Sequence, residues 1–274
     1  MGTLRSFREK LQRRNVTKDV KHYEDCEQLF LTIGLCFAIE ALTEFFQMTA
    51  KEAHPAANIP PFHNIHVGDN RKQYFERILN QFVSKFLFPK ESTSSGTTQD
   101  WIMNYSLCLL QYYFLLIDFK DAVKEGNGKH LSILHKQLVW HFKSIPGYNV
   151  YAIEMLISII QSEVFLSEAE SNQVMWSGTV NWKGGDAKNI EIDLLQENKN
   201  KDLKNLIKAI TRASKAAGGV RQIVENFDEK VALNRKSSAH KHRSDENDIS
   251  IVLSDLRELK PFTYSQGRKY KSKN

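Results

Sequence analysis

Hydrophobic side chains in the first half of the chain recur every three or four residues, which is the spacing of helices rather than of strands. The pattern predicts one helix from near Tyr23 to Phe46 and a second after Gly68-Asp69. A third helix, the most apolar, is expected over Trp101–Val123 and ends at a glycine pair, as helix C-termini often do. Pro-rich and Ser/Thr-rich segments separate the three stripes and predict long loops.

The second half continues the helical spacing but is more polar. Two apolar stripes, 131–142 and 150–165, are separated by Pro146-Gly147, and weaker basic helices are expected over 203–220 and 224–233. The only strand signal is Ser177–Trp182. The pattern therefore predicts an all-α protein, an irregular multi-helix bundle with long loops and a basic, disordered C-terminal tail.

The same pattern indicates how the chain is divided. We expect one helical domain over residues 1–233, with a further boundary in the loop 177–188. Beyond Asn234 the sequence turns polar, so residues 234–274 are interpreted as a basic tail with one short helix near 249–259.

Charge adds a candidate ligand to this picture. The chain has 274 residues and a net charge of +6, with basic ends around an acidic middle, a distribution that suits contact with a polyanion such as DNA. The alternative is that these are solvated charges, which is the default for the N-terminal set Arg5, Arg8, Lys10, Arg13 and Arg14. The candidate phosphate contacts in the tail, which could also form a nuclear import signal, are Arg235, Lys236, Arg243, Arg268, Lys269 and Lys271.

The cysteines and the N-terminus indicate the compartment. Cys26, Cys36 and Cys108 lie within apolar helical stripes without paired spacing, which is typical of reduced thiols in an intracellular protein. The first residues lack the apolar core of a signal peptide. Acidic residues interrupt the apolar stripes, so we expect no membrane-spanning segment and no membrane partner.

Two carboxylates form the best candidate for chemistry. Asp193 and Glu197 follow a glycine loop and are four residues apart, so a helix would place both on one face, where they could hold Mg²⁺. The alternative is that both are exposed helix charges. The histidines of the loop after the first long helix lack cysteine partners, and no hydrolase or kinase template is present, so we expect no metal or other cofactor and no small-molecule substrate.

Several motifs resemble the eukaryotic domain-of-unknown-function family 6589, found in transposon-derived proteins. Its opening residues are similar to Gly2-Thr3-Leu4, and its strongest pattern to Asn189-Ile190, Asp193-Leu194, Glu197, Asn200 and Lys204. Its closing motif is similar to Gly267-Arg268. Two positions depart from the pattern, Asn198 standing where a His is usual and Glu191 where a Pro is common.

The resemblance implies the C-terminal portion of such a protein, because the family's upstream Gly-Asp-Gln segment is not in this chain. If the ancestor was a metal-dependent transposase, Asp193 or Glu197 would be its late acid and the early acids would come from elsewhere. We therefore expect a non-catalytic, nuclear helical remnant that binds nucleic acid or a partner protein. The alternatives are part of a divalent-metal transposase or nuclease, with Mg²⁺ as its cofactor, and a protein-interaction scaffold.

Overall fold

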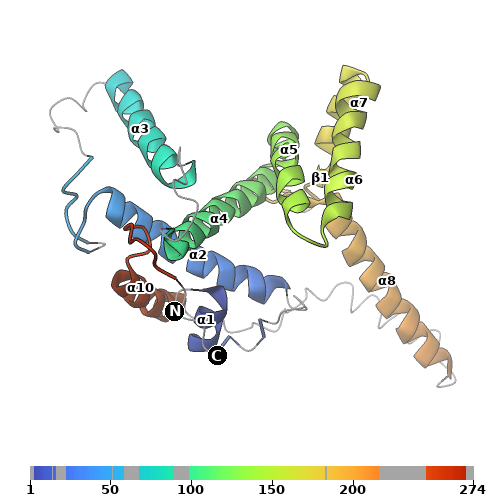
Figure 1. The fold of residues 1–274 in the computed structure, drawn as a ribbon. Coiled ribbons are helices and arrows are strands. Elements are labelled where there is room, and N and C mark those ends of the chain that lie inside the picture. Colours follow the sequence, from blue (N-terminus) through green and yellow to red (C-terminus); the bar gives the residue numbers. More distant parts are fainter. Residues whose placement is uncertain are drawn as a thin grey trace. The chain divides into compact units, whose positions relative to one another are not determined.

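The computed structural model describes residues 3–13, 15–16, 23–50, 52–58, 68–88, 99–182, 184–215 and 245–269, with the backbone alone at 68–70 and 211–215 (Figure 1). Within these ranges the chain is helical apart from loops and one two-stranded hairpin, so the prediction of an all-α fold is confirmed. The chain divides into two compact units, unit 1 (residues 1–115 and 243–274) and unit 2 (residues 116–242). Each unit is described by itself.

Unit 1 joins the two ends of the sequence. Its elements are α1 (Leu4–Lys10), α2 (Tyr23–Phe45), α3 (Gly68–Phe82), the π-helical turn η2 (Val83–Leu87), the first part of α4 (Trp101–Glu125) and α10 (Asp245–Leu259). α2 packs against both α1 and α10, as Figure 1 shows in blue and red. Thr3 begins α1 by accepting a hydrogen bond from the backbone N–H of Ser6, the usual role of a threonine N-cap.

Phenylalanines form the interior of unit 1. Phe37 contacts Phe7 and Phe262 edge to face, with ring centroids 6.4 Å and 6.2 Å apart. Phe262 in turn contacts Phe86 at 5.3 Å, and Phe86 contacts Phe45 at 6.4 Å. Because these five rings come from α1, α2, η2 and the segment after α10, aromatic packing ties together residues that are far apart in the sequence.

A glycine lets two of the long helices approach closely. A Cβ atom at Gly34 of α2 would lie 2.1 Å from Cδ2 of Tyr113 in α4, well inside any normal contact. The Tyr113 ring therefore occupies the space that a larger residue at position 34 would need.

Unit 2 is built on the second part of α4. It contains α5 (Gly128–Ser144), α6 (Asn149–Ile160) with its π-helical extension η3 (Gln161–Phe165), α7 (Glu168–Ser177), strands β1 (Thr179–Val180) and β2 (Ile190–Glu191), and α8 (Ile192–Lys215). α5 packs against both α6 and α7. The strands are antiparallel, with Val180 opposite Ile190. Ser167 and Glu170 form a capping box at the start of α7, a helix that the apolar spacing did not predict.

The structure refines several predicted boundaries. The strand signal at 177–182 is realised as β1, whereas its partner β2 lies just before α8, in a segment for which no strand was predicted. The helix predicted from residue 203 is the second half of the longer α8. The helix expected near 249–259 is α10, and its buried Val252, Leu253 and Leu256 make it part of unit 1. The expected boundary at residue 233 and the helix 224–233 lie outside the described residues.

The division into units falls within α4, between Leu115 and Leu116, and the boundary expected in the loop 177–188 stays a prediction. A continuous helix contributes one half to each unit, so no change in composition marks the division in the sequence.

The acidic residues that interrupt the apolar stripes do not keep two helices below the length and composition of a membrane span. By length and composition alone, α2 and α4 are long and apolar enough to cross a bilayer. Core helices pass the same test, and 56% of the apolar window of α2 is buried within the chain. The packing of α2 against α1 and α10 supports its assignment as a core helix.

Candidate functional site

The predicted carboxylate pair lies at the start of α8. Asp193 is in the first turn and Glu197 one turn later, and both side chains are exposed. Among the described residues, no group of three His, Cys, Asp or Glu side chains converges closely enough to hold a metal ion. Asp193 and Glu197 are exposed charges near a helix N-terminus, and their role in holding a metal stays a prediction.

Asn189, which opens the family-like motif, has a structural role. Its side-chain amide and its backbone N–H both donate to the carbonyl of Lys124, at 2.8 Å and 3.2 Å. A carbonyl in the last turn of α4, which has no partner within the helix, is thereby satisfied. Beside this contact the chain turns at Gly126, whose φ of +67° is readily adopted only by glycine. The motif therefore fixes where α8 begins.

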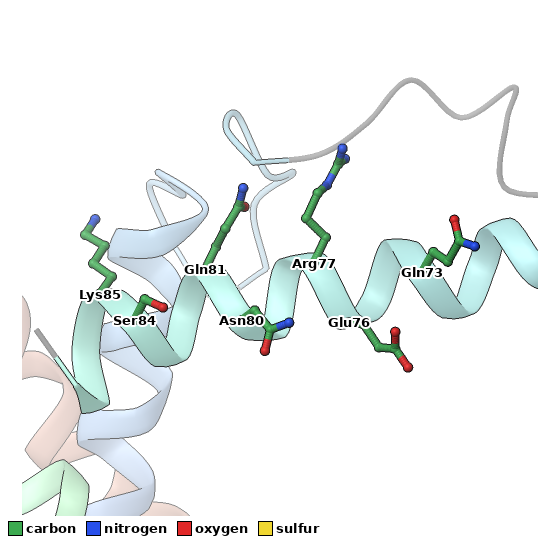
Figure 2. A pocket seen from close by; sticks show the side chains of 7 residues that line it. All are labelled: Gln73, Glu76, Arg77, Asn80, Gln81, Ser84 and Lys85. Carbon is green, nitrogen blue, oxygen red and sulfur yellow. The ribbon is translucent and has the colours of Figure 1, made fainter. Parts of the chain in front are cut away.

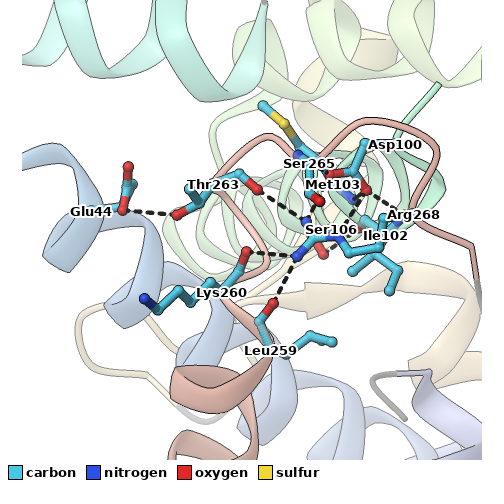
Figure 3. A network of polar contacts seen from close by, with 10 residues as sticks. All are labelled: Glu44, Asp100, Ile102, Met103, Ser106, Leu259, Lys260, Thr263, Ser265 and Arg268. Atoms are coloured by element: carbon cyan, nitrogen blue, oxygen red, sulfur yellow. Dashed lines mark hydrogen bonds and ion pairs between the residues drawn. The ribbon is translucent and has the colours of Figure 1, made fainter. Parts of the chain in front are cut away.

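Arg268, one of the predicted phosphate contacts, is fully engaged within unit 1 (Figure 3). Its Nε and Nη2 donate to the two carboxylate oxygens of Asp100, at 3.1 Å and 2.8 Å. Its other donors reach backbone carbonyls, those of Leu259, Lys260 and Thr263. A guanidinium has five N–H donors, and these contacts use all of them. Arg268 therefore has no donor left for a phosphate.

Asp100 is the buried centre of this network. Its carboxylate accepts from the backbone N–H groups of Ile102 and Met103 at the start of α4, and from that of Ser265 at 2.9 Å. Burial alone would raise the pKa of Asp100, but the hydrogen bonds from Arg268 and from the Met103 and Ser265 amides outweigh it and lower the pKa overall. The carboxylate thus caps α4 and holds the C-terminal segment against it.

The N-terminal arginines also have partners within unit 1. Arg13 binds the fully buried carboxylate of Asp248 through Nε and Nη2, at 3.1 Å and 2.7 Å, and also reaches Asp245 at 3.0 Å. These contacts connect the segment after α1 to the first turn of α10. Other members of the basic set also have partners within the chain: Arg5 with Glu9, Arg8 with the carbonyl of Val16, and Lys10 with Asp255.

The remaining predicted phosphate contacts are distributed differently. Arg235, Lys236, Arg243 and Lys271 lie outside the described residues, as do Arg14, His63 and His66, whereas Lys269 is exposed. A basic row that the sequence reading did not single out is present on α8, where Lys201, Lys204 and Lys208 are all exposed. Their spacing of three and four residues puts them on one side of the helix.

One acidic side chain is buried in the core of unit 1 with little compensation. Glu40 of α2 lies near Arg257 of α10, with 3.6 Å between Oε1 and Nε, and among the described residues this Oε1 atom has no hydrogen-bond partner. Burial raises the pKa of Glu40, and Arg257 offsets only part of this effect. Burial, with a smaller contribution from Glu40, also raises the pKa of Cys36 to about 12. Cys36 is therefore a protonated, unreactive core thiol.

A polar hollow runs beside α3 and η2 (Figure 2). The residues that line it are Gln73, Glu76, Arg77, Asn80, Gln81, Ser84 and Lys85. All of them come from one continuous helical stretch, and Figure 2 shows their side chains fanning out along it rather than converging. Binding pockets normally enclose a ligand between several elements, so this hollow has the character of an open helix surface.

The most unusual surface in the described chain belongs to α6 and η3. Ala152 faces the interior with Met155 and Ile159 partly buried beside it, yet the opposite side of the same helix is also apolar. That side carries a row of β-branched residues that are 39% to 70% exposed: Val150, Ile153, Ile157, Ile160 and Val164. We refer to these five residues as the α6 row.

The α6 row could have been found in the sequence. Its spacing of three, four, three and four residues is visible in the segment 150–165, which we interpreted simply as an apolar helix. What the sequence could not indicate is which of the two apolar faces packs inside the protein. The pairing of Arg268 with Asp100 had no signal in the sequence, because the two residues are 168 positions apart.

Comparison with known proteins identifies a family but no characterised relative. The sequence model of a family described as of unknown function, DUF6589, matches residues 1–240. The match includes all of unit 2 up to α8 and ends before α10 and Arg268. Neither the search of curated proteins nor the search of solved structures gave a match.

Proposed function

The chain belongs to the DUF6589 family, and on this premise we propose that it is a non-catalytic helical protein that binds another protein through the α6 row. The observation that carries this proposal is that α6 has two apolar faces, of which only one packs within its unit. An apolar helix face is normally buried. The exposed face is therefore one that a protein partner would cover.

The amount of exposed apolar surface supports this proposal. Single exposed hydrophobic residues are common, but a contiguous row is typical of an interaction site. Phe165, which ends η3, is 74% exposed and extends the row, and Trp140 of α5, in the same unit, is 75% exposed. Aromatic residues of this kind often anchor protein interfaces. Unit 2 thus offers the side chains that a protein partner would bury.

Site-specific photo-crosslinking tests the proposal. A benzophenone amino acid at Ile157 is expected to form an adduct that protease digestion removes, because a protein covers this position. The matched control is Lys143 on α5, which is exposed and polar. Equal labelling at both positions, or an adduct at Ile157 that is not protein, would reject the proposal.

Nucleic acid is a second candidate, favoured by the basic row on α8. Lys201, Lys204 and Lys208 are all exposed on one side of this helix. Phosphate contacts of this kind release counterions, so binding would weaken steeply with salt. We expect Lys201→Gln/Lys204→Gln/Lys208→Gln to reduce DNA affinity and flatten its salt dependence, whereas Lys269→Gln tests the tail.

Point substitutions are the right tool for this test. Deleting residues 234–274 would also remove α10, whose Val252 and Leu256 are fully buried in unit 1. Loss of binding after such a deletion would then report unfolding rather than a lost phosphate contact. DNA binding at low salt that the triple substitution leaves unchanged would rule out the α8 row.

The origin and location of the protein belong to the same proposal. The motif resemblance supports descent from a transposon, as the C-terminal portion of a longer ancestral protein, and a nuclear location. The metal-dependent alternative would require Asp193 or Glu197 to join acids from another polypeptide. Loss of Mg²⁺ or Mn²⁺ binding in Glu197→Ala would support it, and unchanged affinity would exclude it.

A further inference from the structure

The outer side of α5 alternates lysines with bulky apolar residues. Five exposed residues follow one another in steps of four, three, four and three positions, so they share one side of the helix. The buried leucines of α5, at positions 131 and 134, lie on the opposite side. We refer to the five exposed residues as the α5 row. They are Lys129, Ile133, Lys136, Trp140 and Lys143.

The charge of the α5 row selects an anionic ligand. α5 carries no acidic residue along its whole length. Lys129 and Lys143 lie seven residues on either side of Lys136, which puts about 10.5 Å of helix between successive lysines. Lys136 forms an ion pair with Glu163 of η3, and both side chains are about half exposed, so this contact is a weak surface pair. A row of cations at regular intervals suits a ligand with repeated negative charges.

Trp140 indicates which polyanion this is. It is 75% exposed and lies between Lys136 and Lys143, whereas the outer face of a helix that carries only solvated charges has polar residues between its lysines. An exposed tryptophan can anchor a protein or stack on a nucleic-acid base, and the lysines on both sides favour the base. In a duplex the faces of the bases are covered by their neighbours, so the ligand is single-stranded.

The arrangement of the α5 row disfavours a lipid surface. A helix that lies on a membrane separates its apolar residues from its lysines, which occupy the opposite side. In the α5 row, Ile133 and Trp140 share one side with the three lysines. This interleaving matches a strand that presents bases and phosphates side by side.

We propose that the α5 row binds single-stranded nucleic acid, with Lys129 and Lys143 at phosphates and Trp140 stacked on a base. The row is about 21 Å long, which accommodates several nucleotides of an extended strand. The site is separate from the α6 row and from the lysines of α8, so the inference goes beyond the proposed function and does not rest on it.

Fluorescence anisotropy of a labelled oligothymidylate of about 15 nucleotides, titrated with the full chain, tests the site. We expect Trp140→Leu to weaken binding roughly five- to a hundredfold, the range found when one stacked base loses its aromatic partner. The matched control is Trp176→Leu on α7, which removes a tryptophan that is 51% exposed and should leave the affinity unchanged. Circular dichroism establishes that both variants keep their helices.

Salt dependence tests the lysines separately from the ring. Each phosphate contact to a single strand contributes about −0.7 to the slope of log affinity against log salt. Lys129→Gln/Lys143→Gln should therefore flatten the slope by about 1.4. An unchanged slope in this variant, or equal losses in the two tryptophan variants, would overturn the α5 row. So would binding that the triple lysine substitution on α8 abolishes and the α5 variants leave intact.

Two further measurements distinguish other ways of covering the row. The fluorescence of Trp140, taken as the difference between the wild type and Trp140→Phe, should be quenched by iodide in the free chain and protected by the oligonucleotide. Protection in the free chain would overturn the site, because another part of the chain would then cover it. Equal affinity for the duplex, or Trp140-dependent binding only to phosphatidylserine vesicles, would also overturn it.

Failure of this site and failure of the proposed function remain distinguishable. The proposed function depends on an adduct at Ile157 that protease removes, and none of the results above affects that measurement. At Lys143 an adduct that nuclease removes is nucleic acid and supports the α5 row, so it does not count as labelling by protein.

Discussion

Unit 1 buries its bulky apolar side chains, whereas unit 2 leaves many of them exposed. In unit 1 the phenylalanines of α1, α2 and η2 point inward, and the charged side chains that join its segments pair with one another. In unit 2 the bulky residues of α6, η3 and α8 point outward, and the packed interior rests on a few residues such as Leu131 and Leu134. The contrast indicates that unit 1 has a core of its own, and under the proposed function a partner would cover the exposed residues of unit 2.

The largest expected effect is the loss of stability when a buried ring is removed from unit 1, compared with the removal of an exposed ring from unit 2. Phe37→Ala removes a fully buried ring that contacts Phe7 and Phe262, and should lower the free energy of unfolding by about 3 to 5 kcal/mol. Phe165→Ala removes a ring that is 74% exposed, and should change stability by less than about 0.5 kcal/mol in the monomer. Urea unfolding measures both. Similar losses in the two variants would contradict the comparison.

The ion pair between Asp100 and Arg268 should be nearly as important for unit 1. Arg268→Ala leaves a buried carboxylate without its cation, and we expect a loss of about 3 kcal/mol. Arg268→Lys should recover little, because an ammonium cannot supply the same set of five donors.

The acid sensitivity of unfolding provides a second measure of this pair. The folded-state pKa of Asp100 is lower than its ordinary 3.8, so its contribution is present above that pH and is lost as the pH falls through the folded-state pKa. The Arg268 variants should therefore lose less stability on acidification than the wild type does. An unchanged acid profile would mean that the ion pair contributes little.

A smaller loss is expected where α2 and α4 touch. Gly34→Ala places a Cβ atom where the Tyr113 ring lies, and the resulting overpacking should cost about 1 to 3 kcal/mol. In unit 2, Ser158→Ala on the exposed side of α6 is a matched small change and should be close to neutral. Thermal unfolding compares the two. A neutral Gly34→Ala would mean that the two helices can separate without loss.

The smallest expected effect is a gain. The pKa of Glu40 is higher in the folded state than its ordinary 4.5, so its contribution to stability is present below that pH and is lost as the pH rises through the folded-state pKa. Glu40→Gln removes this loss and should stabilise unit 1 by about 1 kcal/mol at neutral pH, with no gain in acid. Unfolding measured at several pH values tests this, and destabilisation at neutral pH would show that the contact with Arg257 dominates.

Local patterns predicted the helices well where the apolar spacing was strong. The regions expected for α2, α4 and α5 agree with the structure because the periodicity reflects one buried face. The hairpin strand β2 was missed because two residues give no period, and α7 because its start is marked by Ser167 and Glu170 rather than by an apolar stripe. The predictions for residues outside the described ranges stay predictions.

The candidate sites were less predictable than the helices. Arg268 is an arginine in a basic segment, as phosphate contacts often are, and only its pairing with Asp100 assigns it to the interior. The α6 row was visible as an apolar spacing of three and four residues, but this spacing alone does not reveal whether the same chain covers it. Both outcomes depend on contacts between residues that are far apart in the sequence, which local spacing does not encode.

The sequence by itself determined that the chain is helical, because the period of its apolar residues acts over a few neighbouring positions. It also carried the motifs that identify the family. Only the tertiary structure decided that the two ends of the chain share one core, that Arg268 and Arg13 bind buried carboxylates, and that one apolar face of α6 is left exposed. Burial is a property of the whole packed chain, so the same apolar pattern can become an interior in unit 1 and a surface in unit 2.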